Sequence, residues 1–89
     1  MIMPDFKFTK INDLRIRYLD SNNRGTPLLL LHGLGGSIES WTNNIGFLWS
    51  RFRMIALDLP GFGLSDKPKI SYSINFYVNF LEKFIKVWD

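Results

Sequence analysis

Apolar and polar residues alternate in the first part of the chain. The segments FKFTKI, residues 6–11, and LRIRYL, residues 14–19, place an apolar residue at about every second position. This period of two is typical of a strand with one buried face. Asn12 and Asp13 lie between the two segments and favour a tight turn. The pattern therefore predicts an antiparallel β-hairpin.

Two later segments are apolar without alternation. Leu28–Leu31 follows the turn-forming stretch SNNRGTP, and Met54–Leu57 runs into Asp58, shortly before Pro60 and Gly61. A short apolar run of this kind is typical of a strand that is covered on both faces, as in a parallel sheet. We therefore predict two parallel strands at these positions.

Two segments have apolar residues at the spacing of a helix. Residues 37–52 are predicted to be helical, although Gly46 weakens the middle, and their apolar positions are Ile38, Trp41, Ile45 and Leu48. The tail carries a longer stripe of the same period, formed by Ile74, Tyr77, Val78, Leu81, Phe84, Ile85 and Trp88. Ser71 or Ser73 is expected to cap this tail helix.

The predicted order of elements is a β-hairpin followed by β-α-β-α, which places the chain in the α/β class. A chain of 89 residues allows one domain at most. Phe76 and Phe80 lie beside the main stripe of the tail helix and enlarge its apolar surface. A terminal helix on two parallel strands cannot bury that much surface, so we predict that the sheet is incomplete.

The composition is that of a globular domain, because 46% of the residues are apolar and 16% are aromatic. The net charge of +3 comes from dispersed Lys and Arg. Loose basic pairs occur at three places, namely Arg15 and Arg17, Arg51 and Arg53, and Lys67 and Lys69. We expect these pairs on solvated strand or loop edges, since a nucleic-acid surface needs a denser basic stripe. No nucleic-acid partner is predicted.

The chain has no cysteine, which removes disulfides, thiolate chemistry and cysteine-based zinc sites. Its first segment, MIMPDFKFTK, contains an acid and a proline where a signal peptide has a long apolar core. No apolar run approaches the roughly 20 residues that span a bilayer. The sequence therefore predicts a cytoplasmic protein without a membrane partner.

The segment TPLLLLHGLGG, residues 26–36, joins an apolar strand to the single histidine of the chain and a group of glycines. A dinucleotide-binding loop needs G-x-G-x-x-G, but bulky Ile38 stands at the third glycine position. A P-loop needs Gly-Lys-Ser/Thr, which does not follow here. No nucleotide or other cofactor is therefore predicted.

His32 has no acid at a ligand spacing, because Glu39 lies across the glycines. A hydrogen-bonded packing role is therefore favoured over a metal ligand or a general base, and no metal site is predicted. A strand followed by His-Gly-x and further glycines has another use in acyl-transfer enzymes. Small residues there let backbone N–H groups approach a developing oxyanion.

Two motifs in order carry a family resemblance. LLLLHGLGGSIESW, residues 28–41, and MIALDLPGFGLSDKP, residues 54–68, closely resemble the N-terminal part of the α/β-hydrolase family, in its esterase-like branch. Together the motifs cover about half of the chain. Each motif alone is a weak signal, whereas the two in this order and spacing are a strong one.

The resemblance implies roles for residues of both motifs. His32 and Gly33 look like the His-Gly pair that closes the third strand, and the Leu34 N–H looks like one of two oxyanion donors. Gly33 and Leu34 are thus the predicted oxyanion and substrate-binding positions, while His32 orients the loop and is not the catalytic base. The other residues predicted to support the loops are Gly35, Gly36, Ser37, Asp58, Gly61 and Gly63. Residues 65–67 match the S-D-K ending of the family's second motif and are expected to anchor that loop.

The catalytic triad itself is missing from the chain. The family carries its nucleophile on a G-x-S-x-G elbow, followed by an acid and a histidine. The sequences around Ser37 and Ser65, GGSIE and FGLSDK, both lack glycines on the two sides at the required spacing. The resemblance therefore implies that residues 1–89 are an N-terminal fragment of an α/β-hydrolase domain, about the first third of it.

The predicted function is to supply half of the oxyanion hole of a serine hydrolase that acts on a small-molecule ester, thioester or carbon–carbon bond. Epoxide hydrolases and haloalkane dehalogenases of this fold commonly have HG-x-P, whereas Gly35 stands at the position of that proline. The chain alone is predicted to be inactive because it lacks the triad. The alternative is a non-catalytic remnant or a small interaction module that retains the motifs.

The resemblance also predicts a free strand edge. In the family, the strand that corresponds to Leu28–Leu31 lies between the strand of Met54–Leu57 and the strand that carries the nucleophile. With the latter strand missing, one edge of Leu28–Leu31 is expected to be unpaired. An unpaired edge invites association with another chain.

Overall fold

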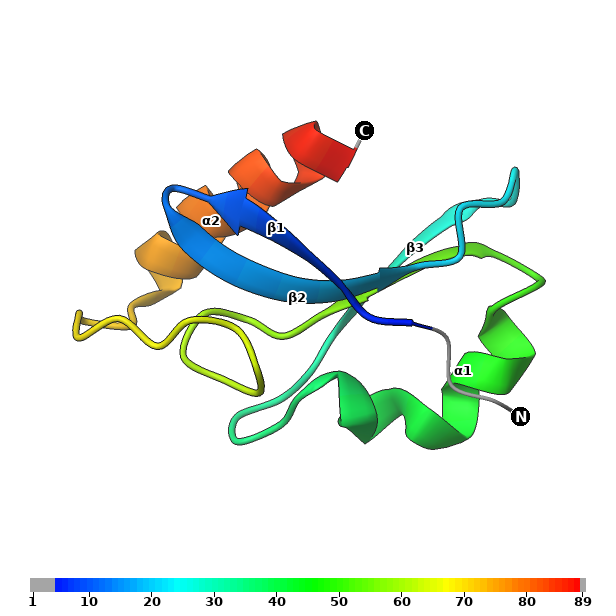
Figure 1. Cartoon of the computed structure of the whole chain (residues 1–89), viewed down its shortest axis with the longest axis horizontal. Coiled ribbons are helices and arrows are strands. Elements are labelled where there is room, and N and C mark those ends of the chain that lie inside the picture. Colours follow the sequence, from blue (N-terminus) through cyan, green and yellow to red (C-terminus); the bar gives the residue numbers. More distant parts are fainter. Residues whose placement is uncertain (1–4, 89) are drawn as a thin grey trace.

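The computed structural model describes residues 5–88, apart from the side chain of Trp88. One four-stranded sheet forms the middle layer, with the strand order β1-β2-β4-β3. Helix α1 (Thr42–Leu48) covers one face of the sheet, and helix α2 (Ile74–Trp88) covers the other (Figure 1). The observed architecture is the predicted α/β class.

The predicted hairpin is confirmed. Strand β1 (Lys7–Ile11) pairs antiparallel with β2 (Leu14–Asp20). Asn12 and Asp13 have positive φ angles of 52° and 64°, as in the two-residue type I′ turn that matches the twist of the strands.

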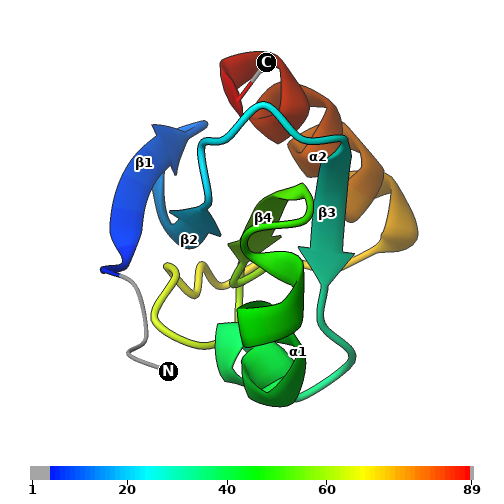
Figure 2. The same ribbon diagram turned by 90° about the vertical axis from the view of Figure 1, so that its right-hand side faces the viewer.

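The two apolar runs form the predicted parallel pair. Strand β3 (Pro27–Leu31) pairs with β4 (Arg53–Leu57) along its whole length. On its other side, β4 pairs antiparallel with the end of β2, which joins the hairpin to the parallel pair. Strand β3 is therefore at the edge of the sheet, and one of its sides has no neighbouring strand among residues 5–88 (Figure 2).

The first helical segment is shorter than predicted. A 3₁₀ turn, η1 (Ile38–Trp41), leads into α1, which ends at Leu48 instead of Phe52. The N–H groups of Arg51 and Phe52 both donate to the Leu48 carbonyl, so the chain tightens into a turn before β4 begins. The prediction of Ser73 as the cap of α2 is confirmed, because its hydroxyl accepts the Phe76 N–H at 3.0 Å.

The core consists of two buried clusters, one on each face of the sheet. The cluster under α2 contains Ile11, Ile16, Ile55, Leu57, Phe80 and Phe84. The cluster under α1 contains Leu19, Leu30, Ile38, Ile45, Met54 and Ala56. Strand β4 supplies alternate residues to both clusters, which explains why its sequence is apolar without a break.

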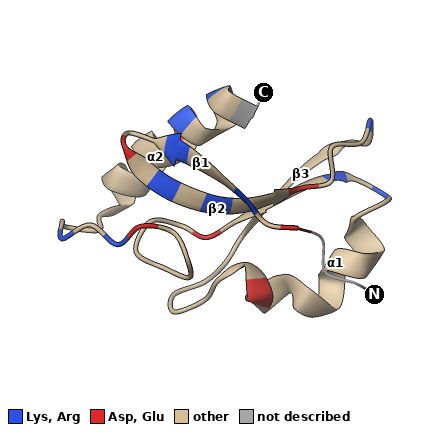
Figure 3. Ribbon diagram, viewed as in Figure 1, with Lys and Arg blue, Asp and Glu red and all other residues tan. Residues whose placement is uncertain are grey.

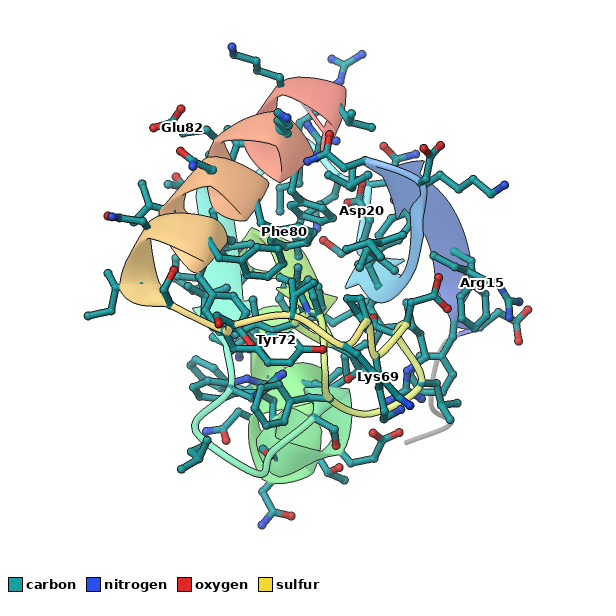
Figure 4. The ribbon with its side chains drawn as sticks, turned by 90° about the vertical axis from the view of Figure 1, so that its left-hand side faces the viewer. Arg15, Asp20, Lys69, Tyr72, Phe80 and Glu82 are labelled. Atoms are coloured by element: carbon teal, nitrogen blue, oxygen red, sulfur yellow. The ribbon has the colours of Figure 1, made fainter. Side chains whose placement is uncertain are left out.

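The buried face of α2 differs from the predicted stripe. Phe80 is only 2% exposed and points at the sheet, while Ile74 is 83% exposed (Figure 4). Val78 and Ile85 are exposed as well. The helix has two overlapping apolar stripes, and the face that carries Phe80 together with Phe84 packs on the sheet.

Candidate functional site

The glycines after β3 form a tight turn. The Gly36 N–H donates to the Gly33 carbonyl at 2.9 Å, and Gly35 at the third position has a φ of +74°. This combination is typical of a type II turn, which needs glycine at that position. Leu34 occupies the second position with a 97% exposed side chain. Its N–H has no hydrogen-bond partner in the described part of the chain.

His32 ties the end of β3 to the loop that follows β4. Its Nε2 accepts the Leu59 N–H at 3.0 Å, and its Nδ1 lies 2.8 Å from the Gly33 carbonyl oxygen. The two contacts together assign the proton to Nδ1, which donates to Gly33. The side chain is buried and packs edge-on against Phe62. Since both ring nitrogens are engaged, the geometry is that of a packing residue.

Asp58 lies at the centre of the site and is fully buried. Its Oδ1 accepts the Ile38 N–H at 2.7 Å. Its Oδ2 accepts the Leu64 N–H at 2.8 Å and the Arg17 Nε–H at 2.7 Å. One carboxylate therefore joins the start of η1, the loop after β4 and strand β2.

Arg17 corrects the expectation that the basic pairs are solvated. Its side chain is 3% exposed, and its guanidinium donates to both carboxylate oxygens of Glu39 as well as to Asp58. The ring of Phe6 lies 4.3 Å from the guanidinium carbon. Burial lowers the pKa of Arg17, but the hydrogen bonds to Glu39 and Asp58 outweigh it and raise the pKa overall. The cation is thus buried because two carboxylates compensate it.

The ion pair of Glu39 with Arg17 is expected to make the free energy of unfolding depend on pH. Its hydrogen bond to Arg17 lowers the pKa below the ordinary value of 4.5, against the opposing effect of burial. Because the pKa is lower in the folded state, the ionised Glu39 carboxylate stabilises the fold at pH values above the ordinary pKa. This contribution is lost as the pH falls through the folded-state pKa. We expect urea unfolding to show wild type more stable than Glu39→Gln at pH 7, with the gap shrinking below about pH 4.5. A gap that stays constant down to pH 3 would contradict this assignment.

The remaining predicted residues lie in the same two loops. Ser37 donates its hydroxyl to Glu39 at 2.9 Å, and the two ring nitrogens of His32 are bonded to Gly33 and Leu59 instead of Ser37. The Gly61 N–H donates to the Asp66 carbonyl at 2.9 Å. A Cβ at Gly36 would lie 2.8 Å from the Ser40 hydroxyl. These positions give the loops their shape.

Ser65 is a structural residue that the sequence indicated only as part of a loop anchor. It is 3% exposed, accepts the Arg17 N–H at 2.9 Å and donates to the Asp58 carbonyl at 2.7 Å. The loop after β4 is thereby joined to β2 through backbone and side chain. The signal for this role was the serine of the second motif, whereas nothing in the pattern around Arg17 indicated its burial.

A cavity of about 220 Å³ lies beside the glycine turn. Its walls come from the loops that follow β3 and β4, from the segment before α2 and from α2 itself. They are formed by His32, Gly33, Leu34, Leu59, Phe62, Tyr72 and Tyr77. The structure thus brings both predicted oxyanion positions, Gly33 and Leu34, to the edge of one hollow.

Residues 5–88 show neither a metal-binding cluster nor a membrane-spanning helix. No group of three or more His, Cys, Asp or Glu residues is placed to hold a metal ion. None of the helices in this part is long and apolar enough to cross a membrane.

Comparison with protein families matches residues 26–87 to the family described as alpha/beta hydrolase fold. The chain belongs to this family. The match includes both motifs, the glycine turn and the Asp58 loop, and it confirms the predicted membership of the α/β-hydrolase family.

Individual relatives agree with this membership. A 2-hydroxy-6-oxo-6-(2'-aminophenyl)hexa-2,4-dienoic acid hydrolase of Metapseudomonas resinovorans is 37% identical over 86 residues, covering 93% of this chain and 29% of the relative. A haloalkane dehalogenase of Psychrobacter cryohalolentis is 34% identical over 100 residues, covering 98% of this chain and 33% of the relative. The crystal structure of Cfl2 from Burkholderia cenocepacia superposes with a TM-score of 0.86 at 26% identity, covering 93% of this chain and 29% of the Cfl2 chain. The chain therefore spans about a third or less of the length of these relatives.

Proposed function

We propose that this chain is the N-terminal part of a serine hydrolase of the alpha/beta hydrolase fold and that it supplies half of its oxyanion hole. The observation that carries the proposal is the unpartnered Leu34 N–H in the glycine turn at the end of β3. The turn is fixed by the hydrogen bond between His32 Nδ1 and the Gly33 carbonyl. It leads into η1, whose first N–H, that of Ile38, donates to the buried Asp58 carboxylate. A donor fixed in this way can stabilise an oxyanion without having to reorganise.

The proposal divides the chemistry between two parts of a longer protein. This chain holds a backbone donor at the position where negative charge develops on the substrate oxygen. The nucleophile, the acid, the catalytic histidine and the second donor would come from residues beyond it. The spans of 29% and 33% that the chain covers in the two hydrolytic relatives support this division.

An ester, thioester or carbon–carbon bond is the proposed substrate bond. The relative from Metapseudomonas resinovorans is named as a hydrolase of a dienoic acid, which supports this class. The relative from Psychrobacter cryohalolentis is named as a haloalkane dehalogenase and represents the competing chemistry. Gly35, at the position where such dehalogenases commonly have proline, favours the first class.

The proposal is tested by assaying the 89-residue chain beside the protein encoded by the full reading frame that contains it. We expect the chain alone to give no turnover of p-nitrophenyl acetate and no labelling by a fluorophosphonate, because it lacks the triad. The longer protein should do both. Turnover or labelling of the chain that disappears in Ser37→Ala would contradict the proposal, as would a frame without a downstream G-x-S-x-G.

A second candidate function, association with a second copy of this chain, rests on the free edge of β3. The opposite edge of the sheet, β1, carries the exposed residues Lys7 and Lys10, whereas β3 has the uncharged sequence PLLLL (Figure 3). Lysines on an edge strand discourage pairing with another strand. The uncharged edge is self-complementary, so two copies can pair β3 with β3 about a two-fold axis.

Sedimentation velocity tests this association. We expect the sedimentation coefficient of the wild-type chain to rise with concentration, and Leu31→Lys to remain monomeric over the same range because it places a charge at the edge. Phe47→Lys is the matched control, since it places the same charge at an exposed ring on α1, outside strand β3. A wild-type chain that stays monomeric, or equal effects of both variants, would rule out the proposed pairing.

A further inference from the structure

We propose that the cavity beside the glycine turn is a subsite for a flat, single-ring aromatic acyl or carboxylate group. The cavity has a volume of about 220 Å³, and Leu34, whose N–H has no partner among the described residues, forms part of its wall. The inference rests on the proposed hydrolase function, because it gives the substrate's acyl group a place next to the proposed oxyanion donor.

Aromatic rings make up most of the cavity wall. The rings of His32 and Phe62 meet edge to face, with centroids 5.2 Å apart. The rings of Tyr72 and Tyr77 are stacked at 6.1 Å. Aromatic rings favour offset-stacked and edge-to-face partners, so this wall suits another flat ring.

The polar atoms of these side chains are already engaged. The Tyr77 hydroxyl donates to the Pro60 carbonyl at 2.8 Å, and the Tyr72 hydroxyl donates to the Pro68 carbonyl. Burial, and then the nearby Tyr72, raise the pKa of Tyr77, so its hydroxyl keeps its proton near neutral pH. The lining has no Asp, Glu, Lys or Arg, and the two ring nitrogens of His32 are both hydrogen-bonded to the backbone. The lining therefore fits an apolar ring with one acceptor oxygen for a backbone N–H.

The size and shape of the cavity narrow the ligand further. Its volume of about 220 Å³, at the lower end of the sizes of ligand pockets, is enough for a single ring. Tyr72 comes from the segment before α2 (Figure 4). It lies close against Gly61, where a Cβ would be 3.0 Å from the Tyr72 ring. Gly61 thereby allows the Tyr72 ring to form this side of the cavity.

The test is an amide-resolved NMR titration of the isotopically labelled chain with benzoate, cyclohexanecarboxylate and acetate. We expect benzoate to shift the amide resonances of Leu34 and Gly35 and the ring resonances of Tyr72, and to bind about tenfold more tightly than the other two acids. Tyr72→Ala and the bulkier Tyr72→Leu should both weaken benzoate binding about tenfold and leave acetate binding unchanged. Phe47→Ala, which removes an exposed ring outside the cavity, should alter neither.

The outcomes separate this inference from the function on which it rests. Benzoate binding no tighter than cyclohexanecarboxylate, or equally weakened by Phe47→Ala, overturns the aromatic subsite. If the aromatic subsite is overturned but acetate still shifts the Leu34 amide resonance, the proposal that Leu34 is an oxyanion donor stands. Failure of all three acids to shift Leu34 overturns both proposals.

Discussion

Replacement of Asp58 by alanine is expected to lower the free energy of unfolding by about 3–5 kcal/mol. The change leaves the N–H groups of Ile38 and Leu64 without their acceptor and leaves the buried Arg17 with Glu39 as its remaining carboxylate partner. Small domains are stable by only about 5–15 kcal/mol in total, so most of the chain's stability is at risk. Urea unfolding followed by circular dichroism measures the loss.

Two further variants make the Asp58 result specific. Asp58→Asn keeps the shape and one acceptor oxygen, so it should fold and give an intermediate loss. Asp66→Ala is the matched control, because Asp66 is exposed and its carboxylate accepts a single backbone N–H, that of Arg15. We expect that control to cost about 1 kcal/mol or less. Similar losses at Asp58 and Asp66 would show that the buried network does not hold the two loops.

Gly63→Ala is expected to be nearly as damaging, at about 3–4 kcal/mol, since overpacking and left-handed strain add. A Cβ at this position would lie 2.2 Å from Asp58 Oδ2, and the backbone has a φ of +55°. The carboxylate cannot move away without losing its hydrogen bonds to Arg17 and Leu64. Thermal and urea unfolding of the variant measure the effect.

Two other glycines separate the causes of the Gly63 effect. Gly35 has a φ of +74° but open space around a Cβ, so Gly35→Ala should cost about 1 kcal/mol from strain alone. Gly33 has open space and no positive φ, so Gly33→Ala should change stability by less than about 0.5 kcal/mol. If Gly63→Ala were no worse than Gly35→Ala, the close contact with Asp58 would be refuted.

Much of the fold could be predicted from the local pattern of apolar and turn-forming residues. The alternation of apolar residues and the Asn12-Asp13 turn predicted the hairpin, and the two unbroken apolar runs predicted the parallel pair of β3 and β4. These features depend on neighbouring residues and on which faces of a strand are covered. The position of β2 beside β4 could not be predicted in the same way, because pairing between distant strands leaves no local period.

The candidate site was predicted where a motif is contiguous and was missed where it depends on distant contacts. His32 and Asp58 stand in the two motifs, and the structure brings the two loops together. Arg17 lies 22 residues from Glu39 and 41 residues from Asp58, so its burial follows from tertiary packing alone. The burial of Phe80 was not predicted for a related reason. The sequence of α2 has two apolar faces, and only its contact with the sheet determines which face is buried.

The most direct test of the central claim compares Leu34→Pro with Leu34→Ala in the protein encoded by the reading frame that contains this chain. Proline is favoured at the second position of a type II turn, so Leu34→Pro removes the N–H while the turn is retained. We predict that kcat for an ester substrate falls about 100- to 1,000-fold in Leu34→Pro relative to Leu34→Ala, with KM little changed. Equal kcat values in the two variants would show that the Leu34 N–H is not an oxyanion donor.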